Sequence, residues 1–230
     1  MHFMGIAPGE AAGFHYDGGR ELYQRENFSR QKVINVRIIS GENKGLTIKA
    51  VPGMTTRPTT DKVRESVYQI IGPYFEGGTM LDLYGGSGVV GLEALSRGLD
   101  HVIFVDKDYK AVKTIKQNIQ AAGAGDRSAV YRNDASKALK AVARKGDKFN
   151  IIFLDPPYEN QQIQKDLIYI DEAGLLQEDG LIIVEHIKKV MPDDDFESFK
   201  LIRREFYGIT VISIYKRREK NDYSDGTGEF

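Results

Sequence analysis

The chain has 230 residues and is close to electrically neutral, with 32 Lys and Arg against 33 Asp and Glu. Hydrophobic residues make up 41% of it, which excludes bulk disorder and predicts one domain, or one domain with a small appendage. The sequence contains no cysteine, which excludes a disulfide scaffold, thiol catalysis and cysteine-ligated zinc or iron–sulfur centres.

Residues 1–32 are rich in glycine and polar groups without a sustained hydrophobic period, so we expect a flexible leader. They lack the basic segment and apolar block of a signal peptide, and no apolar run approaches the roughly 18 residues that cross a bilayer. We therefore expect a cytoplasmic protein without membrane contact. Residues 217–230 are polar and are predicted to form a flexible tail.

The first ordered segment, residues 33–75, is predicted to be a hairpin followed by a helix. Residues 33–39 and 46–51 are β-rich runs, and the turn 41–45 separates them. After a loop with helix-capping residues, apolar side chains recur at helical spacing on one face: Val63, Val67, Ile70, Ile71 and Tyr74.

From residue 79 onward, short apolar runs alternate with amphipathic segments. The predicted strands are 79–83, 101–105, 128–132, 149–154 and 180–185, and the predicted helices are 89–97, 109–122, 135–144 and 161–173. This alternation predicts a parallel sheet covered by helices on both faces. Residues 201–207 and 209–215 are expected to pair as an antiparallel hairpin around Gly208, so that 76–216 form one α/β domain.

A glycine-rich segment follows the first of these strands: Asp82-Leu83-Tyr84-Gly85-Gly86-Ser87-Gly88-Val89-Val90-Gly91. Glycines between a strand and a helix let a ligand approach the backbone and the N–H groups of the helix N-terminus. Its G-x-G-x-x-G spacing alone is a weak indication of NAD. Asp82 favours S-adenosylmethionine (SAM), because a carboxylate there would repel a pyrophosphate and attract an ammonium and a sulfonium. The alternative is a tight strand–helix turn with an incidental aspartate.

Two further polar positions follow neighbouring strands. Asp106 ends the second strand, where an acidic side chain can accept both hydroxyls of an adenosine ribose, in NAD and SAM alike. A lone aspartate there would more often cap the helix that begins near Tyr109. Asn133 and Asp134 follow the third strand; they can hydrogen-bond an adenine amino group, cap the next helix, or do both.

The fourth strand ends in the most specific motif, Asp155-Pro156-Pro157-Tyr158. Two prolines fix the backbone and remove two N–H donors, which leaves carbonyl oxygens as acceptors. A carboxylate and a carbonyl can accept the hydrogens of an exocyclic NH₂, and the tyrosine ring offers a face for an extruded base. Accepting those hydrogens favours a nucleophilic nitrogen. The alternative is a rigid proline turn.

These four motifs, in this order, resemble the class I SAM-dependent methyltransferases that modify an amino nitrogen. Arg37-Ile38-Ile39-Ser40-Gly41, followed by Arg57-Pro58-Thr59-Thr60-Asp61-Lys62-Val63-Arg64-Glu65-Ser66, narrows the resemblance to the bacterial RsmD family of 16S rRNA (guanine-N2)-methyltransferases. The resemblance covers residues 36–215. It implies a Rossmann-like, mostly parallel seven-stranded sheet with a C-terminal antiparallel hairpin and a small N-terminal β-hairpin. Two departures are small: Gly85 stands where alanine is usual, and Tyr158 replaces a frequent phenylalanine.

The resemblance also implies roles for residues. Asp155, Pro156, Pro157 and Tyr158 would hold the target guanine as the catalytic group. The residues implied to bind SAM are Asp82, Tyr84, Gly85, Gly86, Ser87, Gly88, Asp106, Lys107, Asn133, Asp134, Thr59 and Thr60. The methyl group would move by in-line displacement, with no metal and no covalent intermediate.

The near-neutral total hides a basic block between residues 30 and 67, where eight basic residues stand against three acidic ones. A solvated surface is one interpretation. Placed before a base-modifying site, the block also predicts a platform that binds RNA phosphates. The predicted RNA-binding residues are Arg37, Lys44, Arg57, Lys62 and Arg64.

The leading hypothesis is therefore a monomeric 16S rRNA guanine-N2 methyltransferase that acts on the 30S subunit or its assembly intermediate. Three alternatives stay open: an amino-methyltransferase for adenine N6 of DNA or for another RNA, an NAD-dependent oxidoreductase, and a non-catalytic RNA-binding factor. Asp82 and the terminal hairpin disfavour the oxidoreductase, and the intact Asp-Pro-Pro-Tyr motif disfavours the non-catalytic factor.

Overall fold

The computed structural model describes residues 36–53, 61–157 and 162–219, all within one compact unit, Ile34–Phe230. Its helices are α1 (Asp61–Ile71), α2 (Val89–Ser96), α3 (Tyr109–Ala121), α4 (Ala135–Lys145) and α5 (Ile163–Glu172), with a 3₁₀ turn at Gly125–Arg127. Its strands are β1 (Val36–Arg37), β2 (Thr47–Ile48), β3 (Thr79–Asp82), β4 (His101–Asp106), β5 (Ser128–Arg132), β6 (Phe149–Leu154), β7 (Leu176–Ile187), β8 (Phe199–Tyr207) and β9 (Thr210–Arg217).

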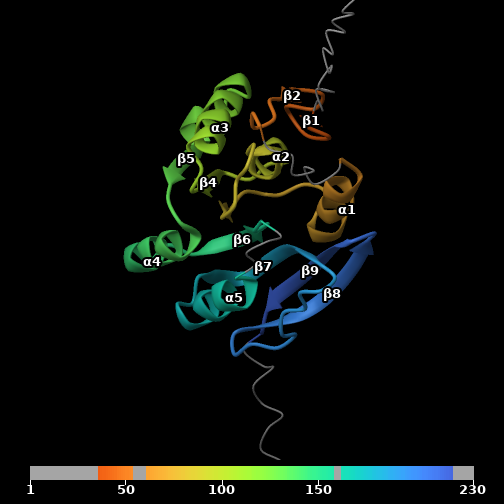
Figure 1. Cartoon of the computed structure of the whole chain (residues 1–230), viewed down its shortest axis with the longest axis vertical. Coiled ribbons are helices and arrows are strands. Elements are labelled where there is room, and N and C mark those ends of the chain that lie inside the picture. Colours follow the sequence, from red (N-terminus) through yellow and green to blue (C-terminus); the bar gives the residue numbers. More distant parts are fainter. Residues whose placement is uncertain (1–35, 54–60, 158–161, 220–230) are drawn as a thin grey trace, which may run out of the picture. The chain divides into compact units, whose positions relative to one another are not determined.

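Seven strands form one sheet in the order β5-β4-β3-β6-β7-β9-β8 (Figure 1). The strands from β5 to β7 are parallel, and β9 pairs antiparallel with both β7 and β8. The chain starts the sheet at β3, adds β4 and β5 on one side, and then continues with β6 on the other. The sheet therefore has a topological switch point between β3 and β6, and ligands of open α/β sheets bind outside the carboxyl ends of the strands at such a point.

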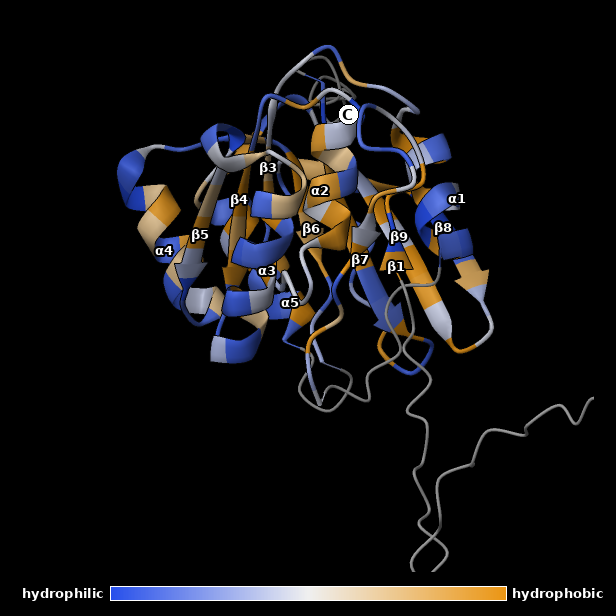
Figure 2. Ribbon diagram, turned by 90° about the horizontal axis from the view of Figure 1, so that it is seen from above, coloured by the Kyte–Doolittle hydropathy of each residue, from blue (hydrophilic) through white to orange (hydrophobic). Residues whose placement is uncertain are grey.

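Alternate residues of the parallel strands supply two separate cores, because successive side chains point to opposite faces. Met80, Phe104 and Ile151 pack with α1, α2 and α3, whereas their neighbours Leu81, Val105 and Ile152 pack with α4 and α5. Figure 2 shows the strands as largely hydrophobic and the outward helix turns as hydrophilic. Helices thus cover both faces, as the sequence predicts.

The N-terminal hairpin packs along α2 and α3. Its turn lies against the last residue of α2, where the Glu42 N–H donates to the Ser96 carbonyl oxygen at 2.9 Å. Further along, the Lys49 N–H donates to Asn118 Oδ1 at 3.0 Å, and Gly53 then lies beside the Lys110 side chain in the first turn of α3. Helices that follow parallel strands run back from the carboxyl edge, so this segment travels from the amino edge of the sheet towards the carboxyl edge.

A buried carboxylate holds this segment in place. The Glu93 side chain, in α2, is 0% exposed and accepts from the N–H groups of Ile39 (2.7 Å) and Ser40 (2.9 Å). Two buried cations meet it: Arg97 Nε donates at 2.8 Å, and Arg64 Nε, from α1, lies 3.6 Å away. Glu93 therefore connects the hairpin and α1 to α2.

The fold predictions are confirmed in class and topology, including both hairpins. The differences lie at the element ends: the N-terminal strands are only two residues long each, and β7 is 12 residues long because it begins before and ends after the predicted strand. The predicted leader and tail fall outside the described residues, except for residues 217–219. Within the described ranges, no helix is long and apolar enough to cross a membrane.

Replacing Glu93 by alanine is expected to lower the free energy of unfolding by about 3–5 kcal/mol, because it removes the counter-charge of the buried Arg97 and leaves the buried Arg64 with Asp61 alone. Urea denaturation of the variant and of wild type measures the difference. Glu65→Ala, at an exposed position of α1, is the control and should change stability by no more than about 0.5 kcal/mol. Equal effects of the two substitutions would contradict the assigned role of Glu93.

Candidate functional site

The predicted cofactor and catalytic residues that the structure describes gather at the carboxyl edge of the sheet, around the switch point. Asp82 ends β3 and Asp106 ends β4, and the two residues lie in adjacent parallel strands. Asp155 follows β6 directly, on the other side of β3. Residues far apart in the sequence thus meet at one edge because the parallel strands end there together.

The glycine turn between β3 and α2 is shaped by close packing and by left-handed backbone conformations. Gly88 precedes the helix with φ 80°, which favours glycine. At Gly91 a Cβ atom would lie 2.3 Å from the Phe104 ring, so only glycine lets α2 pack this closely on β4. At Gly86 a Cβ atom would meet only the Tyr84 carbonyl oxygen, at 3.9 Å, so a ligand has room to approach the backbone there.

Asp82 lies beneath this turn. It is 2% exposed, and its Oδ2 accepts from the Gly91 N–H at 3.3 Å. Burial raises the pKa of Asp82 to about 7, with the Gly91 hydrogen bond acting against the shift and the charge of Asp106 adding to it. A carboxyl group with so little compensating positive charge favours a cationic ligand at the turn.

Asp106 links the glycine turn to α3. Its Oδ2 accepts from the Gly86 N–H at 2.9 Å and its Oδ1 from the Asp108 N–H at 2.8 Å. Burial raises its pKa, although these two hydrogen bonds oppose the shift. Asp108, not Asp106, caps α3, so the capping alternative for Asp106 is wrong. A carboxylate has about four acceptor positions, so Asp106 retains capacity for two hydroxyl groups.

The side chains around this pair have defined partners. The Tyr84 hydroxyl donates to Asp166 Oδ2 in α5 at 2.6 Å, which fixes the ring beside the turn. Asp134 caps α4 by accepting from the Ser136 N–H at 3.1 Å, so the capping interpretation is confirmed. Asn133 Oδ1 accepts from the Asp134 N–H. A contact of Asn133 or Asp134 with adenine stays a prediction.

Asp155 is partly exposed and Pro156 is buried. The pKa of Asp155 is raised well above its usual value, chiefly by burial, then by the charges of Glu185 and Asp82. Glu185 lies near the end of β7, next to β6 in the sheet. The site thus contains four neighbouring carboxyl groups, of which Asp155 is the one beside the prolines.

The remaining predicted residues fall into two groups. Thr59, Thr60, Arg57 and Tyr158 lie outside the described residues. Ser87 contributes its carbonyl oxygen to Asn118 Nδ2 at 2.8 Å, and Lys107 is exposed and accepts from Arg132 Nε through its carbonyl oxygen. Their roles in cofactor binding stay predictions.

The predicted RNA-binding set is corrected at one position. Arg64 is 1% exposed and pairs with Asp61 at 3.1 Å, near Glu93 and the Arg37 carbonyl oxygen, so it is a structural cation and its prediction as an RNA contact is wrong. Its helical position facing α2 is what buries it. Arg37 and Lys62 are exposed. Lys44 is exposed too, but it lies in the hairpin turn near the end of α2, away from the carboxyl edge.

Three residues of this region were missed by sequence reasoning. Glu185 directly follows the apolar run of β7, the same pattern that marks Asp82 and Asp106, so a signal existed. Asn118 is buried in α3 and donates to the carbonyl oxygens of Lys49 (3.0 Å) and Ser87 (2.8 Å). It ties the N-terminal segment to the glycine turn. Neither Asn118 nor Asp166, the partner of Tyr84, has a recognisable sequence signal.

The arrangement suits a cationic nucleoside ligand. No group of three or more His, Asp or Glu side chains suited to a metal ion occurs within the described ranges. The buried Asp82 supplies negative charge beneath an open backbone position at Gly86, and Asp106 has acceptor positions for a ribose.

The raised pKa of Asp82 predicts that folding stability depends on pH. Between about pH 4 and 7 the unfolded chain loses this proton while the folded chain keeps it, so stability falls as pH rises and levels off above about 7. Asp82→Asn keeps an acceptor for Gly91 but cannot ionise. Relative to this variant, wild type should lose about 4 kcal/mol between pH 4 and 8.

Denaturant unfolding of both proteins across that pH range measures the effect. Asp126→Asn, at an exposed position, is the control and should follow wild type. Parallel stability curves for wild type and Asp82→Asn would contradict the raised pKa.

Comparison with known proteins identifies the family. The family model described as "Conserved hypothetical protein 95" matches residues 36–216. The candidate rRNA methyltransferase YlbH of Bacillus subtilis (strain 168) is 50% identical over 80% of this chain and 100% of its own length. Ribosomal RNA small subunit methyltransferase D of Escherichia coli (strain K12) is 30% identical over 81% of this chain and 92% of its own length.

The fold agrees. The solved structure of yhhF from Escherichia coli, described as a candidate methyltransferase, superposes with a TM-score of 0.68 at 30% identity and covers 80% of this chain and 98% of that one. The glycine turn at the switch point, the carboxylates that end β3 and β4, and the match over residues 36–216 agree with one another. On these grounds the chain belongs to the RsmD family of class I SAM-dependent methyltransferases.

Proposed function

We propose that this protein transfers the methyl group of SAM to the exocyclic N2 of a guanine in 16S ribosomal RNA, within the 30S subunit or its assembly intermediate. The observation that carries the proposal is Asp155-Pro156-Pro157 at the carboxyl end of β6, across the switch point from the glycine turn. The relatives named as rRNA methyltransferases support RNA as the substrate class.

Binding of SAM is assigned to the turn and its carboxylates. Asp82 attracts the cationic methionine end through a low-dielectric environment, in which a charge acts more strongly than in water. Asp106 accepts the ribose hydroxyls, and Asn133 and Asp134 border the adenine. When bound, SAM supplies an electrophilic methyl group on a sulfonium. Tyr84, held by Asp166, closes one side of the turn.

Asp155 is assigned to the target amine. Its carboxylate and a nearby backbone carbonyl accept the two hydrogens of N2, which turns the nitrogen lone pair towards the methyl group. The N–C bond forms as the C–S bond breaks, and the nitrogen then gives a proton to Asp155. The raised pKa of Asp155 makes it a better proton acceptor than an exposed aspartate. Orientation of the two substrates supplies most of the rate gain.

Asp155→Ala is expected to lower methyl transfer by roughly a hundredfold or more while SAM binding persists, because the acceptor of the amine hydrogens is removed. Transfer of labelled methyl groups to 30S subunits and to naked 16S rRNA measures this. Mass spectrometry of the digested RNA then identifies the methylated nucleoside. N2-methylguanosine supports the proposal, and N6-methyladenosine, or undiminished transfer by Asp155→Ala, contradicts it.

SAM affinity is expected to rise with pH between about 6 and 8. A cationic ligand favours the ionised form of Asp82, whose pKa is about 7 without ligand, so binding releases a proton from that side chain. Calorimetric titrations at several pH values, in buffers of different ionisation enthalpy, measure affinity and proton release together. Asp82→Asn should bind SAM more weakly and with a flatter pH dependence; an unchanged pH dependence in this variant would argue against the role of Asp82.

A further inference from the structure

The most basic part of the described chain is not the N-terminal block. Residues 109–145, which comprise α3, β5 and α4, contain nine Lys and Arg against two Asp. Neither α3 nor α4 contains an acidic residue. Eight of the nine basic side chains belong to exposed residues; the exception, Arg127, is partly buried and pairs with Glu42.

The topology brings these residues to one edge of the sheet. β5 is the edge strand, with α3 packed on one face of the sheet and α4 on the other. Successive residues of β5 point to opposite faces. Arg132 lies over the ring of Tyr109 in α3, at 5.8 Å, and Tyr131 lies under the Lys145 ammonium of α4, at 5.5 Å. The strand therefore joins the two helical faces into one surface, which we name the β5 edge.

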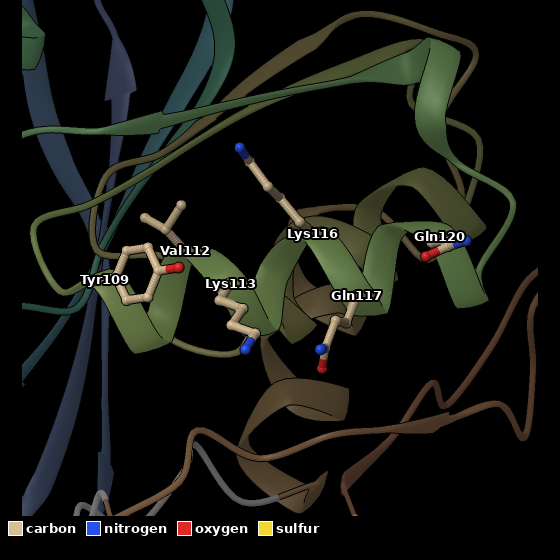
Figure 3. A pocket seen from close by; sticks show the side chains of 6 residues that line it. All are labelled: Tyr109, Val112, Lys113, Lys116, Gln117 and Gln120. Atoms are coloured by element: carbon tan, nitrogen blue, oxygen red, sulfur yellow. The ribbon is translucent and has the colours of Figure 1, made fainter.

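Aromatic side chains accompany the charge. Tyr109 is 61% exposed and Tyr131 is 45% exposed. On the outer face of α3 a shallow depression that is open to solvent is lined by Tyr109, Val112, Lys113, Lys116, Gln117 and Gln120; we call it the hollow on α3 (Figure 3). Lysines for phosphate, glutamines for hydrogen bonds and a tyrosine for stacking are the groups that bind single-stranded nucleic acid.

The β5 edge begins beside the candidate active site. Arg132 is the register partner of Asp106 across β4 and β5, so the basic surface starts one strand away from the predicted ribose-binding carboxylate. The two regions carry opposite charge and therefore suit different ligands. The carboxyl edge contains buried carboxylates that favour a cation, whereas the β5 edge repels a cation and attracts a polyanion.

We propose that the β5 edge is an RNA-binding surface, on which Lys113 and Lys116 of α3 and Lys140 and Arg144 of α4 contact phosphates and the hollow on α3 receives one nucleotide. The proposal rests on the proposed function in naming RNA as the polyanion. The β5 edge lies at the end of the sheet opposite β8, and it would add to the RNA contacts that are predicted for the N-terminal segment.

The test neutralises pairs of charges. Lys113→Gln with Lys116→Gln removes the α3 pair, and Lys140→Gln with Arg144→Gln removes the α4 pair; glutamine preserves helix propensity at these exposed positions. Arg203→Gln with Lys216→Gln, on β8 and β9 at the other end of the sheet, is the matched control. Circular dichroism and SAM titration check that each variant folds and keeps its cofactor site.

Affinity for a fluorescein-labelled RNA copied from 16S rRNA is measured over a series of salt concentrations. Each β5-edge pair should weaken binding roughly tenfold at low salt and reduce the steepness of log affinity against log salt by about one to two. The reason is that RNA binding releases fewer counterions when fewer phosphates are neutralised by the protein. The control pair should leave both quantities unchanged. If both edge pairs bind as wild type does, the β5 edge is only a solvated surface and the proposal is overturned.

A second measurement addresses the hollow at high salt, where phosphate contacts are weakened. Tyr109→Ala should lower RNA affinity roughly fivefold or more, and Tyr109→Phe should retain it, because a ring without its hydroxyl still stacks. Equal RNA affinities of Tyr109→Ala and Tyr109→Phe would contradict the binding of a nucleotide in the hollow on α3.

Methyl transfer to 30S subunits is assayed in parallel. If wild type transfers methyl groups and the edge variants bind RNA with unaltered affinity, the proposal for the β5 edge is contradicted and the proposed function stands. Salt-dependent RNA binding that the edge variants weaken, without methyl transfer by wild type, supports the β5 edge and contradicts the proposed function.

Discussion

The structure depends on one buried carboxylate. Glu93 accepts from the Ile39 and Ser40 N–H groups of the N-terminal segment and faces Arg64 of α1 and Arg97 of α2. A buried charge is costly unless it is paired, and here the pairing requires residues from three parts of the chain. The N-terminal segment and α1 are therefore held against α2, so that Gly53 arrives at the first turn of α3, beside the carboxyl edge.

The carboxyl edge has the opposite energetic character. Asp82, Asp106 and Asp155 all have raised pKa values because burial disfavours their charge, and hydrogen bonds to Gly91, Gly86 and Asp108 offset it only in part. Such a cluster destabilises the free protein near neutral pH. A cationic ligand that supplies the missing positive charge would relieve this, so the feature that weakens the fold also provides binding free energy. Local conflicts of this kind are typical of functional sites.

The near-neutral net charge of −1 is an average over unlike regions. Four carboxyl groups gather at the carboxyl edge, where the cofactor is proposed to bind, and exposed basic side chains lie on the outer faces of α3 and α4. The low dielectric constant of the protein interior strengthens the interactions of the buried carboxylates with a charged ligand. Exposed lysines instead bind a polyanion with release of its counterions. A methyltransferase with a cationic cofactor and a polyanionic substrate needs both, separated by the width of a strand or more. The basic block in the N-terminal sequence contributes less to a phosphate-binding surface near the candidate site than expected. Arg64 is buried, and Lys44 lies near the end of α2, away from the carboxyl edge of the sheet.

The sequence by itself determined the layers of the fold, since strand–helix alternation and a terminal hairpin around Gly208 dictate parallel and antiparallel pairing. It also determined the glycine turn and the aspartates that end strands, because their spacing reflects local backbone requirements. The tertiary structure decided which of these side chains are exposed and what they contact. Arg37 and Arg64 both belong to the basic N-terminal block, and the sequence does not distinguish them. The packing of α1 on α2 buries Arg64, whereas Arg37 stays exposed. Asn118 bonds to Lys49, 69 positions away, and Glu93 bonds to Ile39, 54 positions away, and no local pattern encodes such contacts.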